Sequence, residues 1–185
     1  ICGLFVTSAA LAQDASSSNV LTDDVSYSPD WENSGENGNH YSLFEDHVLD
    51  GNNHNLTVSI PSDDITWTRV ITARFGDLNF SNIGTLKIED HATASTDGLI
   101  YAENSHNLVL GSIGTLDVTS DESLPIHGKG GTIAVNAENI FLHAIDNVTV
   151  MAQPVLYDGK VSLVASGDMK IVSEEYGAVA ACVLG

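Results

Sequence analysis

The stretch Asp77-Leu-Asn-Phe-Ser-Asn-Ile-Gly-Thr-Leu-Lys-Ile88 recurs along this chain at a nearly constant interval. It returns as Asn107-Leu-Val-Leu-Gly-Ser-Ile-Gly-Thr-Leu-Asp-Val118, more loosely as Asn139-Ile-Phe-Leu-His-Ala-Ile-Asp-Asn-Val-Thr-Val150, and in part from Asp168. The starting positions 77, 107, 139 and 168 are 30, 32 and 29 residues apart. Repeats of this length, made of short alternating apolar segments, are typical of one structural unit stacked on itself.

Each repeat divides into three short strands with apolar residues at alternating positions. In the repeat that begins at Asp77 these strands cover residues 78–80, 86–88 and 100–102, the last of them after the turn Asp97-Gly98. Alternation with a period of two places one set of side chains in a core, and small residues allow the chain to bend between strands. No segment of ten residues or more shows a helical stripe, so little helix is expected.

The pattern predicts an all-β fold, a right-handed parallel β-helix of four to five coils with three short strands per coil. Each coil would rise by one strand spacing, so the stack would be about 20 Å long. An antiparallel sandwich would also have many short strands, but it would not repeat one phrase at near-equal intervals. The first apolar residues of the repeats are expected to lie in register on one sheet, pointing inward: Leu56, Leu78, Leu108, Ile140 and Met169.

One polar residue precedes each of these first strands. These residues are expected to stack as a structural ladder at a coil corner, with each side chain hydrogen-bonded to backbone: Asn55, Asp77, Asn107, Asn139 and Asp168. The ladder predicts a role in stability rather than in chemistry.

The chain divides into three parts. Residues 1–12 carry no charge and end in Ala10-Leu-Ala12, which predicts the remnant of a secretory signal peptide. Residues 13–46 are polar and acidic and are interpreted as a linker and cap. Residues 47–185 hold the β-helix repeats, and the last repeat is short, which predicts a C-terminal truncation and an N-terminal piece of a longer protein.

The charge is strongly one-sided. Six Lys and Arg stand against 25 Asp and Glu, for a formal net charge of −19. Such a surface repels phosphate, so nucleic acid is excluded as a partner. The sequence contains no run of about 18 apolar residues, so no membrane span is predicted in this segment. The two cysteines, Cys2 and Cys182, are too few for a disulfide framework.

No catalytic, cofactor-binding or metal-binding residue is predicted. His40, His47 and His54 are spaced seven apart, which places neighbours on opposite faces of a strand. The oxygen-rich turn at residues 50–55 lacks the ordered acids of a calcium loop. A polysaccharide hydrolase needs paired carboxylates at set separations, whereas Asp63-Asp64 and His127-Gly128 are isolated fragments. The chain is therefore expected to be no enzyme and to need no cofactor.

The signal, the acidic lead-in, and coils reading N-L-x-Φ-x-x-I-G-T-L-x-V with D-G-x-I-Y-A together resemble the passenger of an autotransporter. This is the type V secretion family of Gram-negative bacteria, and the resemblance covers roughly residues 47–185. It implies a β-helical passenger that a C-terminal β-barrel carries to the cell surface. It also implies an adhesin-like or structural role, with a host or surface glycan or protein as partner, in a protein that is secreted or displayed outside the outer membrane.

Two further expectations accompany this interpretation. The alternative function is a β-helical carbohydrate-active enzyme or a carbohydrate-binding module. The open C-terminal end of the stack, which includes Val179, Val183 and Leu184, predicts end-to-end self-association.

Overall fold

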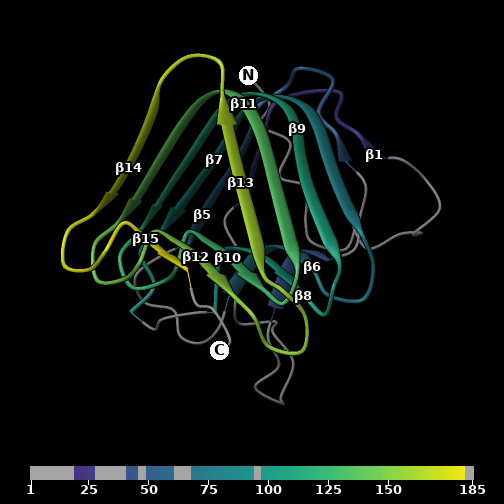
Figure 1. Cartoon of the computed structure of the whole chain (residues 1–185). Coiled ribbons are helices and arrows are strands. Elements are labelled where there is room, and N and C mark those ends of the chain that lie inside the picture. The colour runs from purple at the N-terminus through teal and green to yellow at the C-terminus, as the bar shows by residue number, and fades with distance from the viewer. Residues whose placement is uncertain (1–18, 28–40, 46–48, 61–67, 94–96, 182–185) are drawn as a thin grey trace.

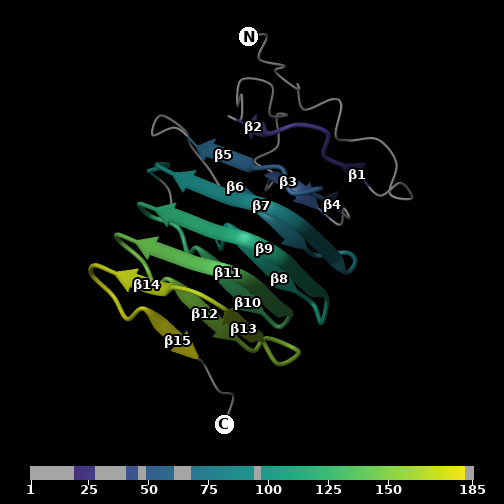
Figure 2. The same cartoon turned by 90° about the horizontal axis from the view of Figure 1, so that it is seen from above.

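The computed structural model describes residues 19–27, 41–45, 49–60, 68–93 and 97–181. Throughout these ranges the secondary structure is β, and parallel strands stack as a solenoid of about 4 turns (Figure 1). The fold class predicted from the repeats is confirmed. Figure 2 shows the turns side by side as successive layers, with β1 and β2 at one end of the stack and β15 at the other.

The strands form two sheets, and the strand pairs within each sheet are parallel. The larger sheet contains β1 (Asn19–Val20), β2 (Val25–Tyr27), β4 (Leu49–Asp50), β5 (Leu56–Ile60), β7 (Leu78–Asp90), β9 (Asn107–Ser120), β11 (Thr132–Ala144), β13 (Lys160–Ala165) and β14 (Met169–Ser173). The smaller sheet contains β3 (Tyr41–Glu45), β6 (Thr68–Ala73), β8 (Ile100–Glu103), β10 (Ile126–Lys129), β12 (Val150–Gln153) and β15 (Val179–Ala181).

The prediction of three short strands per coil needs a correction in the middle of the stack. There the first two predicted strands are one continuous strand, such as β7 with 13 residues and β9 with 14. Asn82 (φ 54°) and Ser112 (φ 56°) adopt the left-handed conformation within these strands. A single residue of this kind re-aims the chain without ending the ladder, whereas separate strands occur in the outer turns.

Each turn nevertheless has three sides, as Figure 1 shows along the stack. The first limb of each long strand lies with β13, the second limb lies with β5 and β14, and the smaller sheet closes the third side. In Figure 1, β13, β14 and β15 follow one another counterclockwise while successive turns approach the viewer. The solenoid is therefore right-handed, as predicted and as parallel crossovers generally are.

The register expectation is right for two neighbouring pairs, Leu78 with Leu108 and Ile140 with Met169, and wrong for the continuity of the column. Leu78 lies opposite Leu108, as predicted. Leu108 faces Ile133 on its other side, however, and Ile140 faces Leu116. The connection from β9 to β11 is shorter than the spacing of the repeated phrase predicts. The third copy of the phrase, which starts at Asn139, therefore pairs with the second limb of β9 and not with its first limb.

The five residues expected in one column therefore occupy two. The first-limb column runs through Leu78, Leu108, Ile133 and Val161, and the second-limb column runs through Leu56, Leu86, Leu116, Ile140 and Met169. These columns form the core, and residues such as Leu86, Leu108 and Leu116 are fully buried. The last described turn is less covered: Val161 is partly buried and Met169 remains 45% exposed.

Part of the predicted linker also contributes strands. Within residues 13–46, β1 pairs with β4, β2 with β5 and β3 with β6, all in parallel. These strands add a turn at the N-terminal end. The predicted signal segment 1–12 lies outside the described residues. Within the described ranges no helix has the length and apolar character to cross a membrane.

Candidate functional site

A tetrad recurs in the smaller sheet, and it places charged groups side by side. Its copies are Ile71-Thr72-Ala73-Arg74, Ile100-Tyr101-Ala102-Glu103 and Ile126-His127-Gly128-Lys129. The first and third residues pair in register and are buried in the core. The second and fourth residues take the opposite face of each strand. The outer side of this sheet therefore carries one column of Thr72, Tyr101 and His127 and a second column of charged residues.

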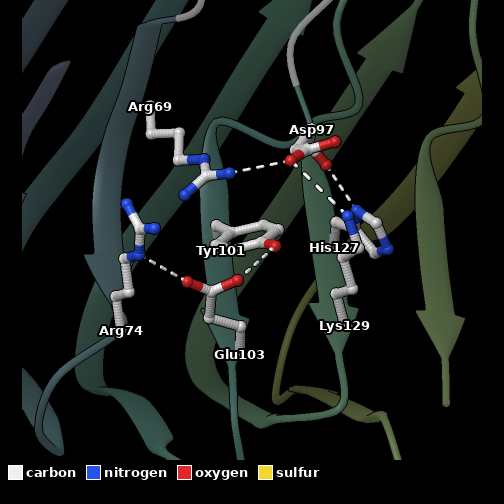
Figure 3. A network of polar contacts seen from close by, with 7 residues as sticks. All are labelled: Arg69, Arg74, Asp97, Tyr101, Glu103, His127 and Lys129. Atoms are coloured by element: carbon white, nitrogen blue, oxygen red, sulfur yellow. Dashed lines mark hydrogen bonds and ion pairs between the residues drawn. The ribbon is translucent and has the colours of Figure 1, made fainter. Parts of the chain in front are cut away.

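Three of the six Lys and Arg residues of this acidic chain gather at this face (Figure 3). Arg69 Nη2 lies 2.7 Å from Asp97 Oδ2, and Lys129 Nζ lies 3.6 Å from the same oxygen. Arg74 Nε lies 2.7 Å from Glu103 Oε1. The pairs connect β6, β8 and β10, so they join three successive turns. We call these five residues, with Tyr101 and His127, the polar network.

Tyr101 lies at the centre of the polar network and is fully buried. The Arg69 guanidinium lies over its ring, 4.0 Å from the ring centroid, and Arg69 is itself only 4% exposed. The Tyr101 hydroxyl donates a hydrogen bond of 2.9 Å to Glu103 Oε2. Burial raises the pKa of Tyr101, and the nearby Glu103 raises it further, so the hydroxyl remains protonated.

His127 packs edge-on against Tyr101, with ring centroids 5.5 Å apart and an interplanar angle of 81°. Its Nδ1 contacts the backbone carbonyl oxygen of Asp97, and because a carbonyl only accepts, Nδ1 carries the proton. Burial lowers the pKa of His127, with weaker opposing effects from Asp97 and Gln153. The ring is therefore neutral at pH 7, and its buried Nε2 makes no hydrogen bond of standard geometry in the described part of the chain.

Asp97 is the anionic centre of the polar network. Burial alone would raise its pKa, but Lys129 and Arg69 outweigh burial and hold the pKa below its usual value. The carboxylate is thus ionised and engaged by two cations. Every ionised group of the network contacts an opposite charge, which is the arrangement of a structural junction between turns.

Sequence reasoning missed this network. It treated His127-Gly128 as an isolated fragment and did not group Arg69, Arg74 and Lys129. The signal that was available is the tetrad Ile-x-small-charged, which recurs at residues 71, 100 and 126. The charge at its fourth position alternates in sign from Arg74 to Glu103 to Lys129. Opposite charges on neighbouring strands stabilise a sheet, so this alternation indicates that the three strands are neighbours.

The predicted ladder residues lie at two corners. At the corner before the first limb, Asp77 accepts from the Asn107 backbone N–H at 2.8 Å and from Asn107 Nδ2 at 3.1 Å. At the corner before the second limb, Asn139 Oδ1 accepts from the Asp168 backbone N–H at 3.0 Å. The structure therefore brings these residues together in pairs and divides the five between two columns.

Asn55 belongs to the second of these corners. Its backbone N–H donates to Asp24 Oδ1 at 2.9 Å, and its Nδ2 donates to Asp24 Oδ2 at 3.0 Å. The hydrogen bond from the Asn55 backbone N–H lowers the pKa of Asp24, and the hydrogen bond from the Asn107 backbone N–H lowers the pKa of Asp77. Asp24 was not predicted because it lies in the segment interpreted as a linker.

A third corner contains a buried acid. Asp90 is 1% exposed and accepts hydrogen bonds from Ser120 Oγ at 2.9 Å and from the Ala92 N–H at 3.0 Å. Ser120 Oγ in turn accepts from the Ser123 N–H at 2.8 Å. Burial raises the pKa of Asp90 despite these hydrogen bonds. This corner is a compact polar cluster, and among the described residues no cation forms an ion pair with Asp90.

A shallow groove of about 260 Å³ lies on the outer side of β9, β11 and β14. Its lining comprises Asp117, Phe141, Leu142, His143, Lys170 and Val172. Asp117, Phe141 and Lys170 are register partners across the three strands. We call these three residues the Phe141 row.

The three histidines spaced seven apart, which were not predicted to form a site, cannot be compared as a set. His40 and His47 lie outside the described residues, and His54 Nδ1 lies 3.5 Å from Asp24 Oδ1. Within the ranges that the structure describes, no group of three or more His, Cys, Asp or Glu is arranged to hold a metal ion.

Comparison with known proteins gives no match: no protein-family model, no curated protein and no solved structure corresponds to this chain. The interpretation of the polar network, the corner pairs and the groove therefore depends on their chemistry.

Proposed function

We propose that this chain is a rigid scaffold segment of an exported cell-surface protein, similar to an autotransporter passenger, with a structural and adhesive role. The observation that supports the proposal best is the continuous parallel stack from β1–β3 to β13–β15, joined from turn to turn at its corners. A stack of this kind holds its outer faces in a fixed arrangement, which suits surface display.

The role that we propose is not enzymatic and uses no cofactor. The polar network contains the best candidates for acid–base chemistry, but each of them has a structural partner. Asp97 holds Arg69 and Lys129, Tyr101 donates to Glu103, and His127 donates to a backbone carbonyl. A general acid or base needs a position within reach of a substrate proton, whereas Tyr101 and His127 are 0% and 3% exposed.

A host or surface glycan or protein is the partner that we propose. The net charge of −19 disfavours anionic partners such as nucleic acid and supports a neutral or cationic target. Among the alternatives, the groove at the Phe141 row favours a carbohydrate-binding module, because it combines an aromatic side chain with polar neighbours.

Surface display is tested by fusing the chain, behind a secretion signal, to an outer-membrane β-barrel translocator in a Gram-negative cell. We expect the folded chain on intact cells, measured as antibody labelling and as resistance to added protease. The control is Leu110→Asp, which buries an unpaired carboxylate at a fully buried core position and so gives a protease-sensitive chain. Retention of the unaltered chain inside the cell, with the translocator itself at the surface, would overturn the proposal.

Self-association through the C-terminal end is part of the same proposal. In the last turn, Val164 and Val179 are 54% and 64% exposed, and the inward residues Val161 and Leu163 are only partly buried. Strand edges with exposed apolar side chains add further strands.

A further inference from the structure

The Phe141 row is built as a platform. Its three residues take neighbouring places on parallel strands, so Asp117 and Lys170 flank Phe141 at roughly 5 Å on either side. Their chain neighbours Leu116 and Leu142 lie in the core and Ile171 packs against it, which fixes the row on the outer side. A rigid sheet rather than a loop therefore positions the three side chains.

The side chains of this row differ from those of the polar network in how they are engaged. Phe141 is partly exposed and lines the groove, whereas Tyr101 is fully buried. Lys170 is exposed and forms no ion pair with any described residue, whereas Arg69, Arg74 and Lys129 each contact a carboxylate. The row thus presents an aromatic ring, a carboxylate and an uncommitted ammonium group to solvent.

The next row completes the lining. His143 follows Phe141 by two residues and lies between Thr119 and Val172 on the same outer face. Glu174 Oε1 lies 2.8 Å from His143 Nε2, which holds the imidazole ring in place. The groove therefore has one aromatic and one aliphatic wall, with hydrogen-bonding groups on several sides.

We propose that this groove is a subsite for one neutral pyranose unit of a glycan. The inference rests on the proposed adhesive role. A pyranose has a C–H face that packs on an aromatic ring and a rim of hydroxyl groups. Asp117 accepts hydrogen bonds from hydroxyls, and Lys170 donates to hydroxyl or ring oxygens. A groove of about 260 Å³ is below the range of about 300–1,000 Å³ for drug-sized ligands, which suits a single ring.

Charge favours a neutral sugar over an acidic one. Asp117 and Glu174 both lie beside the groove, against one uncommitted cation, Lys170. The whole chain carries −19 as well, so a uronate would meet repulsion in its approach and at the site.

The test is saturation-transfer NMR on the purified chain with methyl α- and β-glycosides of glucose, galactose and mannose, and with methyl galacturonate as the acidic comparison. We expect at least one neutral glycoside to bind and methyl galacturonate to bind more weakly. Phe141→Ala should weaken the binding about tenfold or more, and Lys170→Met about threefold to tenfold. Lys160→Met is the matched control, since Lys160 is an exposed lysine on β13, outside the groove lining, and this variant should bind unchanged.

The outcomes separate clearly. Absence of saturation transfer from every neutral glycoside at about 100 mM would overturn the inference, because single-ring sites have affinities in the range of about 1–10 mM. A preference for galacturonate, or equal losses in Lys160→Met and Lys170→Met, would also overturn it. If circular dichroism shows that Phe141→Ala does not fold, the Lys170→Met and Lys160→Met pair decides.

Failure here is distinguishable from failure of the proposed function. A chain that reaches the cell surface but binds no glycoside contradicts only the subsite. A chain that binds a neutral glycoside but is not displayed supports the subsite and favours the carbohydrate-binding module over the passenger.

Discussion

At the scale of single residues, two glycines show how closely the turns approach one another. Gly84 and Gly114 occupy the same place in the repeated Ile-Gly-Thr-Leu phrase. A Cβ atom added to Gly114 would collide with the carbonyl oxygen of Gly84. The glycine is needed here for space between backbones, and its φ is not among the left-handed values of the chain.

We therefore expect Gly114→Ala to lower the free energy of unfolding by about 1–3 kcal/mol, because the backbones of two turns must separate. Gly111→Ala is the control on the same strand, since its new Cβ would have its nearest neighbour at 3.9 Å. The control should change stability by less than about 1 kcal/mol. Urea unfolding monitored by circular dichroism measures both, and equal losses would contradict the stacking explanation.

The shifted pKa values of the corner acids Asp90 and Asp77 predict opposite effects of pH on the stability of the folded chain. The pKa of buried Asp90 is raised above 3.8, so its ionisation weakens the folded state as pH rises from about 3.8 through the folded-state pKa. Replacing it by Asn removes that loss. The stability of Asp90→Asn relative to the unaltered chain should therefore increase across this pH window and then level off.

Asp77 provides the comparison of opposite sign. Its pKa is lowered from 3.8, so its contribution to stability is present above 3.8 and is lost as pH falls through the folded-state pKa. Asp77→Asn should thus be less stable than the unaltered chain at neutral pH, and the difference should shrink in acid. Urea unfolding at pH values from 2.5 to 7 measures both differences (a range set by the carboxyl pKa values), and a shared sign would contradict the assignment.

At the scale of elements, the polar network joins β6, β8 and β10 through contacts that no single strand could make. Arg69 serves two partners, the Asp97 carboxylate at 2.7 Å and the Tyr101 ring at 4.0 Å. Its removal would take away the cation over the Tyr101 ring and leave Asp97 with Lys129 as its remaining ion-pair partner among the described residues.

We expect Arg69→Met to destabilise the chain by about 2 kcal/mol or more, since half-buried Asp97 loses its closer ion-pair partner and the Tyr101 ring loses the guanidinium over it. Lys87→Met is the control: Lys87 pairs with Glu89 at 2.7 Å on the surface, where both side chains are more than a third exposed. An exposed pair contributes about 0–1 kcal/mol. Thermal unfolding of the two variants measures both losses of stability. A larger loss for Lys87→Met than for Arg69→Met would show that the network is not a structural junction.

At the scale of the whole molecule, the core is best sealed in the middle turns and opens toward the C-terminal end of the stack. Inward residues of β7 and β9 are 0–2% exposed, whereas Met169 in the last described turn is 45% exposed. Large exposed apolar side chains gather in this turn and its loops, including Leu156 at 82% and Val179 at 64%. In the larger and smaller sheets alike, β13, β14 and β15 have a described partner on one side.

We expect the chain to self-associate through this end, and more strongly at high salt, because salt screens the repulsion between molecules of net charge −19. The double substitution Met169→Lys and Val179→Lys should weaken the association at equal protein concentration. Sedimentation velocity in about 0.05 and 1 M NaCl measures it, where the screening length falls from about 14 to 3 Å. A monomer under all conditions would contradict the proposal, as would association that the two lysines leave unchanged.

The sequence determined the class of fold and its tightest contacts, because these depend on local pattern. Alternating apolar residues specify which side of a strand is buried, and near-identical phrases at residues 77 and 107 stack as expected, with Leu78 opposite Leu108. The same phrase marked Gly84 and Gly114, whose lack of a side chain is required by the spacing between turns.

Only the tertiary structure decided where the column of repeats shifts between β9 and β11, and how side chains group across turns. The pairing of Ile140 with Leu116 depends on the length of the connection between β9 and β11, to which local alternation is insensitive. Asp24 with Asn55, and Arg69 with Asp97, meet across 31 and 28 residues. Such pairs form only when stacking brings neighbouring turns within one strand spacing, so their chemistry belongs to the assembled solenoid and not to any segment of the chain.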